Sequence, residues 1–414
     1  MGRVKAHAQF IEDRGFDYLD GSLCLNHIKD KRLMIELEEE DDVDACRICG
    51  DTSTSRTSLD SVLSVVMEAV NSLFIPTYDD PYEFDQRTTD RWGILEFVCD
   101  EAFDSTSDDL LQLFVECVQQ EDWADNPGSL EDTVLGWDQF VDDVKSASRF
   151  VFVAETRLSS SYGSPGQRSA GFLNSLLPYI ENESLRLLTV LSSGFACYRG
   201  RLVSRQNDPM SLSKDLGPAP PSIARSNRMS PTGIPMFYAS GSPATACREL
   251  AAHGPERYAR IGKFVSLREL KVLDLTRLPK LPSPFDRERR HHHGILAFFT
   301  RFAETIAAPL EPGSVEELEY VPTQVVTEFF RWVPKNKIDG IKLKSAQDGK
   351  PTYVFFFTAS DFTDGADIND TFNDGWRIGA NPAFKLESSD VHTFEIKRSI
   401  TAQQLPDKRE RRQM

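Results

Sequence analysis

The chain has 414 residues, of which 40% are apolar and 27% are charged. This composition is typical of globular proteins and excludes a wholly disordered chain, and the length suits two or three domains. The formal net charge of −17 repels polyanions, so it argues against general binding to nucleic acids or anionic membranes.

The first ten residues and the lengths of the apolar runs indicate the cellular location of the protein. MGRVKAHAQF lacks the apolar core of a signal peptide, and no run is apolar for long enough to cross a bilayer. Seven cysteines in a chain of this length do not resemble a disulfide framework. We therefore expect a cytoplasmic protein with no membrane partner.

Residues 1–52 carry two pairs of candidate metal ligands, each pair with a two-residue gap that lets both side chains face one tetrahedral ion. The four candidates are Cys24, His27, Cys46 and Cys49. Alternatively, the two later cysteines form a thioredoxin-like redox pair, but no βαβ pattern surrounds them. We predict a zinc-binding module whose Zn²⁺ is structural, because four protein ligands leave no open position for catalysis.

Residues 53–192 are predicted to form a mainly helical domain. Apolar residues recur every three or four positions from Leu59 to Leu73 and again from Leu110 to Val118, which is typical of helices with one buried stripe. A further helix is expected over Gly171–Leu191. No histidine lies between positions 28 and 252, so this domain offers none for acid–base catalysis. We interpret it as an arm for contacts or for homodimer formation.

The pattern changes in residues 193–400, where short β-rich runs alternate with helical patterns. This alternation predicts an α+β domain with a mixed sheet, and residues 401–414 are expected to be a flexible tail. The expected strands are Phe195–Tyr198, Met236–Ala239, Lys263–Val265, Val272–Leu275, Ile338–Leu343, Tyr353–Thr358 and Thr393–Ile396. The expected helices are Thr245–His253, Ile295–Ile306 and Thr323–Trp332.

One stretch of this domain, from Asn227 to Leu250, combines a loop, a short strand and a helix. Ser242 followed by Pro243 is a helix N-cap with proline at the first helical position. This arrangement is expected to bring Arg228, Tyr238 and Glu249 to one end of a sheet. An arginine, a tyrosine and a glutamate suit a ligand with phosphates, a ring and ribose hydroxyls. Taken singly, an arginine–glutamate pair is more often a salt bridge, and a tyrosine in an apolar run more often belongs to the core.

Residues 195–400 resemble the RES domain family, which is named for its arginine, glutamate and serine. The matching pieces are Tyr198-Arg199 at a strand end, Arg228…Tyr238…Glu249, Tyr320-Val321-Pro322-Thr323-Gln324, and Asp339-Gly340-Ile341 followed by Ser345. Position 227 is asparagine where the family often has glycine, and asparagine tolerates a left-handed backbone. The cysteine/histidine cluster and the helical segment resemble the HEPN/RES N-terminal region that precedes some RES domains.

The resemblance implies an ADP-ribosyltransferase-like fold that binds NAD⁺ and cleaves its nicotinamide–ribose bond, and a toxin of a bacterial toxin–antitoxin system. We expect Arg199 and Arg228 to hold the pyrophosphate, because guanidinium groups form paired bonds to phosphate. Tyr238 is expected beside the nicotinamide ring, Glu249 at the ribose hydroxyls and the cationic sugar, and Ser345 at the ribose or at the attacking phosphate or water.

Three functions remain open from the sequence. The first is an NAD⁺-cleaving enzyme that uses phosphate or water as acceptor. The second is an ADP-ribosyltransferase that modifies a macromolecule. The third is a non-catalytic, zinc-stabilised protein that only binds nucleotides or partners. An antitoxin is expected as a partner of a toxin, but no residue identifies it.

Overall fold

The computed structural model describes residues 14–38, 44–77, 88–104, 107–125, 132–152, 164–182, 185–308, 315–364 and 382–398. The predicted tail, 401–414, lies outside the described residues. The chain divides into two compact units, and each is described by itself. Unit 1 comprises Met1–Leu185 and Leu278–Glu304, and unit 2 comprises Arg186–Arg277 and Thr305–Met414. In the described part of the chain, no helix is both long and apolar enough to cross a membrane.

Unit 1 is mainly helical. Its elements in chain order are β1 (Ser22–Cys24), η1 (Leu25–His27), α2 (Lys31–Glu36), β2 (Arg56–Ser58), α3 (Leu59–Leu73), β3 (Phe74–Pro76), β4 (Thr88–Asp90), α4 (Arg91–Cys99), α5 (Ser107–Cys117), β5 (Asp122–Asp125), α6 (Asp132–Asp142), η2 (Asp143–Ala147), α7 (Pro165–Ser175), α8 (Leu177–Ile180), η5 (Arg290–His292) and α11 (His293–Ala307), whose last turn enters unit 2.

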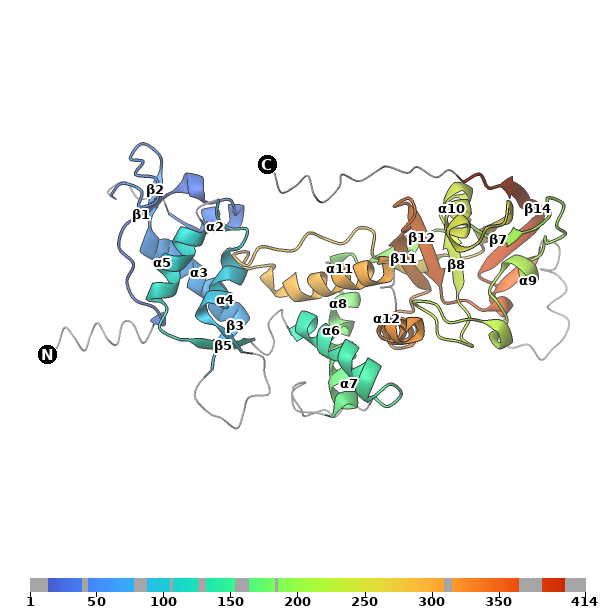
Figure 1. Ribbon diagram of the computed structural model, residues 1–414, viewed down its shortest axis with the longest axis horizontal. Coiled ribbons are helices and arrows are strands. Elements are labelled where there is room, and N and C mark those ends of the chain that lie inside the picture. Colours follow the sequence, from blue (N-terminus) through green and yellow to red (C-terminus); the bar gives the residue numbers. More distant parts are fainter. Residues whose placement is uncertain are drawn as a thin grey trace, which may run out of the picture. The chain divides into compact units, whose positions relative to one another are not determined.

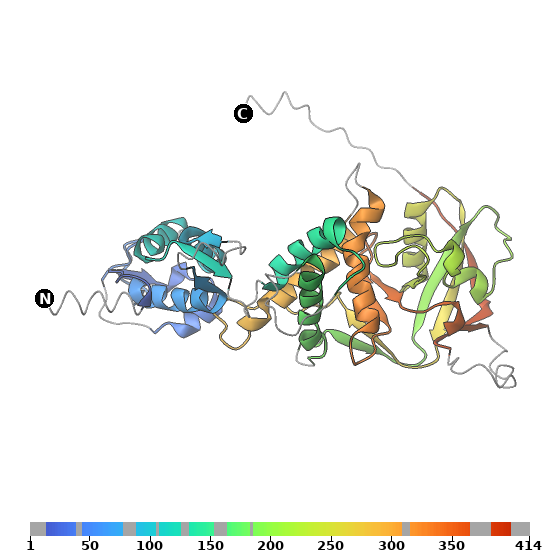
Figure 2. The same ribbon diagram turned by 90° about the horizontal axis from the view of Figure 1, so that it is seen from below.

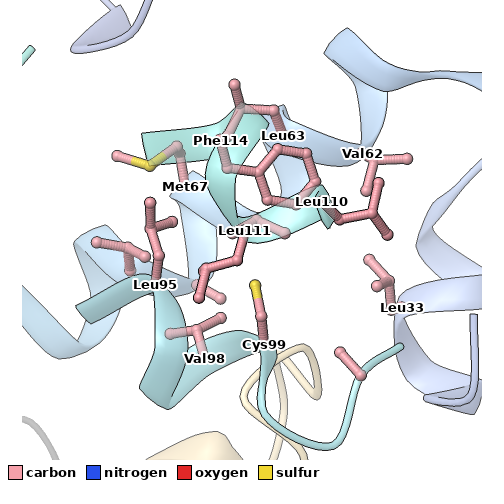
Figure 3. Packing of buried hydrophobic residues seen from close by; sticks show 14 of the residues in the cluster. Leu33, Val62, Leu63, Met67, Leu95, Val98, Cys99, Leu110, Leu111 and Phe114 are labelled. Carbon is pink, nitrogen blue, oxygen red and sulfur yellow. The ribbon is translucent and has the colours of Figure 1, made fainter. Parts of the chain in front are cut away.

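The apolar stripes predicted from spacing form the first core of unit 1. Helix α3 starts where the Ser58 hydroxyl accepts the Ser61 N–H, and its buried face meets α4 and α5. Figure 3 shows side chains of these three helices interlocking, with Leu33 of α2 at the edge. Fully burying each large apolar side chain contributes about 1.5–3 kcal/mol to stability. The cluster also contains Cys24 and Cys46, so it stabilises the part of unit 1 that carries the cysteine/histidine residues.

A second, aromatic cluster joins α6, α7 and α11, which lie side by side in Figures 1 and 2. The Trp137 ring lies 5.5 Å from Phe298 and 5.9 Å from Phe302, both edge to face, and Phe172 of α7 completes the contact. Edge-to-face pairs are favoured by the quadrupoles of the rings. Trp137 is therefore a core residue.

Two features of this region differ from the sequence prediction. The prediction of a helix over Gly171–Leu191 is wrong, because α7 ends at Ser175 and Leu188–Leu191 is a strand of unit 2. Pro178 explains the break, because proline has no N–H to continue the helical bonding of α7. The three-stranded antiparallel sheet β3–β5–β4 was not predicted, since strands of three or four residues carry almost no periodicity.

Unit 2 is built on a mixed sheet, as predicted. Its elements are β6 (Leu188–Leu191), β7 (Ala196–Val203), α9 (Ser213–Leu216), η4 (Pro221–Ile223), β8 (Phe237–Ser240), α10 (Pro243–His253), β9 (Tyr258–Ser266), β10 (Leu270–Asp274), α12 (Glu316–Trp332), β11 (Gly340–Lys344), β12 (Pro351–Phe355), η6 (Ala359–Asp361), β13 (Phe362–Asp364) and β14 (Phe384–Glu395).

The nine described strands run in the order β13-β14-β9-β7-β8-β12-β11-β10-β6. Strands β7 and β9 pair along eight residues, and β8 and β12 along four, but β7 and β8 share the single pair Tyr198↔Ser240. The sheet therefore consists of two halves that meet at one point and separate from there. Strand β7 also runs past the predicted end at Tyr198, so Arg199 lies inside the strand and not at its end.

The two faces of the sheet are covered differently. One face carries the phenylalanine cluster of Phe237, Phe264, Phe355 and Phe384. On the other face α10 lies across the strands (Figure 1), and its Ala246 packs with Ala259 and Ile261. Successive strand residues alternate between faces. The register places Tyr198, Tyr238 and Ser240 on the α10 face, and Arg199 on the phenylalanine face.

Candidate functional site

Helix α10 carries Glu249 and is fixed at its start by the predicted cap. The Ser242 hydroxyl accepts the Thr245 N–H at 3.1 Å, and Pro243 occupies the first turn. This start places Glu249 in the second turn, where it is half-buried and faces the end of β11. There the buried Ser345 hydroxyl donates a hydrogen bond to Glu249 Oε1. The glutamate and serine singled out from the sequence are thus in direct contact across 96 residues.

The hydrogen bonds of Ser345 define what its hydroxyl can do. Its oxygen also accepts the Gln347 N–H at 3.1 Å, while its main-chain N–H donates to the Lys350 carbonyl at 2.8 Å. A hydroxyl has one proton to donate, and that proton is directed at Glu249. In this arrangement Ser345 orients the carboxylate.

Tyr238 of β8 has a different set of neighbours. Its hydroxyl lies 3.0 Å from Ser230 Oγ, and burial raises its pKa to about 12, so the phenol stays neutral at physiological pH. The positive charge of Arg199 acts in the opposite direction and lowers the pKa of Tyr238 in part. Tyr238 and Glu249 belong to the same side of the sheet, yet no hydrogen bond joins these two described residues.

The loop before β8 is held by α12. Gln324 Nε2 donates to the Asn227 carbonyl at 2.7 Å and to Ser226 Oγ at 2.9 Å, and the Thr323 hydroxyl donates to the Arg228 carbonyl. Asn227 and Ser230 close the loop with two main-chain bonds of 2.8 and 3.2 Å. Asn227 does not adopt the left-handed backbone that its sequence position suggested, since Gly233 provides the positive φ of this loop instead.

The two arginines of interest have separate sets of contacts. Arg228 Nη1 donates to the Thr305 carbonyl at 3.1 Å, and its guanidinium lies 5.3 Å from the Tyr320 ring. Arg199 Nη1 reaches the Met236 carbonyl at 3.5 Å, and its guanidinium lies over the Phe237 ring. Burial, with a contribution from Arg201, lowers the pKa of Arg199 to about 10.

Neither of these two guanidinium groups pairs with a carboxylate in the described part of the chain; their contacts are carbonyl oxygens and ring faces. A part-buried cation without a counter-ion is unfavourable by itself and attracts an anion. The structure thus leaves Arg199 and Arg228 able to bind phosphate groups.

Comparison with known families finds a match that spans most of these residues. The family model described as RES domain matches residues 200–376, which contain Arg228, Tyr238, Glu249 and Ser345. The chain carries a RES domain. The model described as HEPN/RES N-terminal domain 1 matches residues 39–158, so the RES domain follows the N-terminal region expected from the sequence. No curated protein and no solved structure matched the chain in the same comparisons.

Other residues of the RES motifs have structural roles. Asp339 receives two bonds from Arg268, at 2.8 and 3.1 Å, and one from the Lys271 N–H. Gly340 is required by close packing, because a Cβ there would lie 2.5 Å from the Val354 carbonyl oxygen. Both residues shape β11, at whose end Ser345 lies.

The four predicted metal ligands of unit 1 also come together. Their ligand atoms all lie within 4.8 Å of one another, so the cluster could hold a metal ion. Cys46 and Cys49 sit in a tight turn that continues into Gly50, whose φ of +72° favours glycine. Burial raises the pKa of Cys46, but main-chain N–H groups around it outweigh this and lower it to about 6. That shift favours the thiolate of Cys46, the form that binds metals, whereas burial and the neighbouring Cys49 and Cys46 raise the pKa of Cys24 to about 12.

Sequence reasoning did not identify two residues that support these clusters. Asp104 Oδ2 lies 2.9 Å from His27 Nδ1, which leaves Nε2 for a metal. Asp348 contacts two residues of α10, Thr245 and Arg248. Asp104 lies 77 residues from His27, and Asp348 lies 103 and 100 residues from Thr245 and Arg248. No motif links these distant partners, so only the folded chain could reveal the contacts. The spacing of Thr245, Arg248 and Glu249 on one helix face was the one available signal.

Proposed function

We propose that the RES domain cleaves the nicotinamide–ribose bond of NAD⁺, with phosphate or water as the acceptor, and that the protein is a bacterial toxin that depletes NAD⁺. The RES-domain match and its family association with NAD⁺-related activity and toxin–antitoxin systems support this function. The observation that carries it is the Glu249 carboxylate held by Ser345.

A carboxylate held in one orientation meets the main electrostatic demand of this reaction. As the glycosidic bond breaks, nicotinamide keeps the bonding electron pair and leaves neutral, so it needs no general acid. The ribose becomes cationic at the reacting carbon, and a fixed carboxylate stabilises that charge as it does in glycosidases. An oxygen of phosphate or water then forms the new bond at that carbon, and an attacking water releases one proton to the solvent.

The other candidate residues fit the rest of the dinucleotide. Arg199 and Arg228, which lack carboxylate partners among the described residues, suit the pyrophosphate. Tyr238, neutral and half-buried, suits the nicotinamide ring. The two half-sheets that meet only at Tyr198↔Ser240 are compatible with the ADP-ribosyltransferase-like fold that the resemblance implies. Tyr238 and Arg199 flank this separation of the strands.

We further propose that the cysteine/histidine cluster binds Zn²⁺ with a structural role. Thiolates about 2.3 Å from a tetrahedral ion lie about 3.8 Å apart, and Cys24 Sγ and Cys49 Sγ are separated by 3.6 Å. Three thiols and one imidazole suit zinc and fill its coordination. The ion would fasten η1 and the 46–49 turn together, with no open position for substrate.

The test of the proposed activity is product analysis. Full-length protein is incubated with NAD⁺, with and without phosphate, and the products are separated by chromatography. Free nicotinamide with ADP-ribose phosphate identifies phosphorolysis, whereas ADP-ribose identifies hydrolysis, and ADP-ribose bound to protein identifies transfer. Glu249→Gln should abolish nicotinamide release. Unchanged NAD⁺ with the wild type would sink the proposal and leave a nucleotide-binding role.

A further inference from the structure

The turn between β11 and β12, residues 345–350, is fixed to α10 by two of its side chains, those of Ser345 and Asp348. The register pairs Lys344 with Pro351, and the Ser345 N–H bonds to the Lys350 carbonyl at 2.8 Å. Within the turn, Gly349 has a φ of +69° and its N–H bonds to the Ser345 carbonyl at 2.9 Å. Main-chain hydrogen bonds thus fix the conformation of the turn, whereas side-chain hydrogen bonds fix its position against α10.

On the helix, three residues face this turn. Thr245, Arg248 and Glu249 occupy positions i, i+3 and i+4, which lie on one side of an α-helix. Glu249 receives the bond from Ser345. Thr245 and Arg248 both donate to Asp348 Oδ2, at 3.0 and 2.9 Å.

Asp348 is thus the second anchor of the turn, three residues after Ser345. Its other oxygen, Oδ1, accepts the Lys350 N–H at 3.1 Å, so one carboxylate joins the turn to itself and to α10. Its side chain is only 10% exposed, whereas that of its partner Arg248 is 53% exposed. Thr245 is fully buried and also touches the N-cap through Ser242 Oγ at 2.8 Å.

We propose that Asp348 is a positioning residue for Glu249. It holds the 345–350 turn against α10, and the turn in that place keeps the Ser345 hydroxyl on the Glu249 carboxylate. This inference rests on the proposed catalytic role of Glu249. Asp348 accepts two of these three side-chain hydrogen bonds between the turn and α10. Without Asp348, only the bond from Ser345 to Glu249 remains of the three.

The experiment compares NAD⁺ cleavage by the full-length wild type, Asp348→Ala, Asp348→Asn, Ser345→Ala and the double variant Asp348→Ala/Ser345→Ala. Nicotinamide release gives kcat and KM, and hydrogen–deuterium exchange reports the 345–350 and 245–250 peptides. Glu395→Ala is the matched control, because it removes another aspartate/glutamate–arginine ion pair of unit 2, with Arg257.

If Asp348 acts through Ser345, Asp348→Ala lowers kcat by roughly 10-fold, since small misplacements of reacting groups have effects of this size or larger. KM changes less, and Asp348→Asn, which keeps an acceptor oxygen, recovers part of the rate. In the Ser345→Ala background the same substitution has no further effect, because the coupled pair is already broken. Exchange in the 345–350 peptide rises in Asp348→Ala and stays unchanged in Glu395→Ala.

Three results overturn the inference: an Asp348→Ala variant with wild-type kcat, additive losses in the double variant, or a kcat loss of equal size in Glu395→Ala. If the wild type releases no nicotinamide, the proposed function fails by itself. Hydrogen–deuterium exchange then still tests whether Asp348 holds the turn. An unchanged exchange rate of the 345–350 peptide in Asp348→Ala shows that this carboxylate does not hold it.

Discussion

The proposed zinc module offers the most quantitative test, through the replacement of Asp104 by alanine. Asp104 Oδ2 lies 2.9 Å from His27 Nδ1, which fixes the ring and directs Nε2 toward the three cysteines. Removing such a partner lowers metal affinity by roughly 10- to 100-fold. The Asp104 side chain is 30% exposed, so solvent weakens the bond and we expect the lower end, roughly 10- to 30-fold.

The loss should be specific to the carboxylate. The main chain of residue 104 also donates to the His27 carbonyl at 2.9 Å, and this contact survives the substitution. Asp104→Asn keeps an oxygen that accepts the Nδ1 proton, so its affinity should fall between wild type and Asp104→Ala. Asp30→Ala is the control: Asp30 caps α2 through the N–H groups of Arg32 and Leu33, and its loss costs about 1 kcal/mol of stability without touching a ligand.

The assay titrates Zn²⁺ into the full-length protein against a chromophoric chelator at fixed pH and reads the competition. Wild-type affinity in Asp104→Ala refutes the role of Asp104, and an equal loss in Asp30→Ala attributes the effect to general stability. Protein purified without chelator that contains no zinc ends the zinc proposal altogether.

Three further predictions concern unit 2. Arg199→Met should raise the KM for NAD⁺ by roughly 10- to 100-fold, the worth of one charge-assisted bond, in steady-state kinetics; an unchanged KM removes Arg199 from the pyrophosphate site. Gln324→Glu should lower kcat/KM more than Gln324→Ala, because it turns a carboxylate toward the Asn227 and Ser230 oxygens, and the reverse order contradicts that geometry. Asp274→Ala should destabilise unit 2 by about 3–5 kcal/mol in urea denaturation, since it leaves the buried Lys342 charge unpaired. Burial raises the pKa of Asp274, but hydrogen bonds from Lys342 and Thr276 outweigh it and leave that pKa lowered. The contribution of Asp274 to stability is therefore present above the unfolded pKa of about 4 and is lost as the pH falls through the folded pKa. An Asp274→Ala variant as stable as the wild type at both low and neutral pH contradicts this prediction.

Much of the local structure could be predicted from the sequence. The spacing from Leu59 to Leu73 gave α3, and Ser242-Pro243 gave the start of α10 with its end at His253. These features depend on periodicity and capping, which are local properties. Prediction failed at the start of α12, which was expected at Thr323, whereas the helix begins at Glu316 and continues through Pro322. Packing of Tyr320 and Val321 in the core offsets the missing main-chain bond.

By itself, the sequence determined the candidate groups: four side chains able to bind a metal, with suitable gaps, and an arginine, tyrosine, glutamate and serine in the order of a RES domain. Only the tertiary structure decided which of them meet. It joined Glu249 to Ser345, placed Arg199 and Tyr238 on opposite faces where β7 and β8 separate, and supplied Asp104 and Asp348. The physical reason is that residues nearly a hundred positions apart become neighbours only when packing and strand register fix the chain, and neither is written in local spacing.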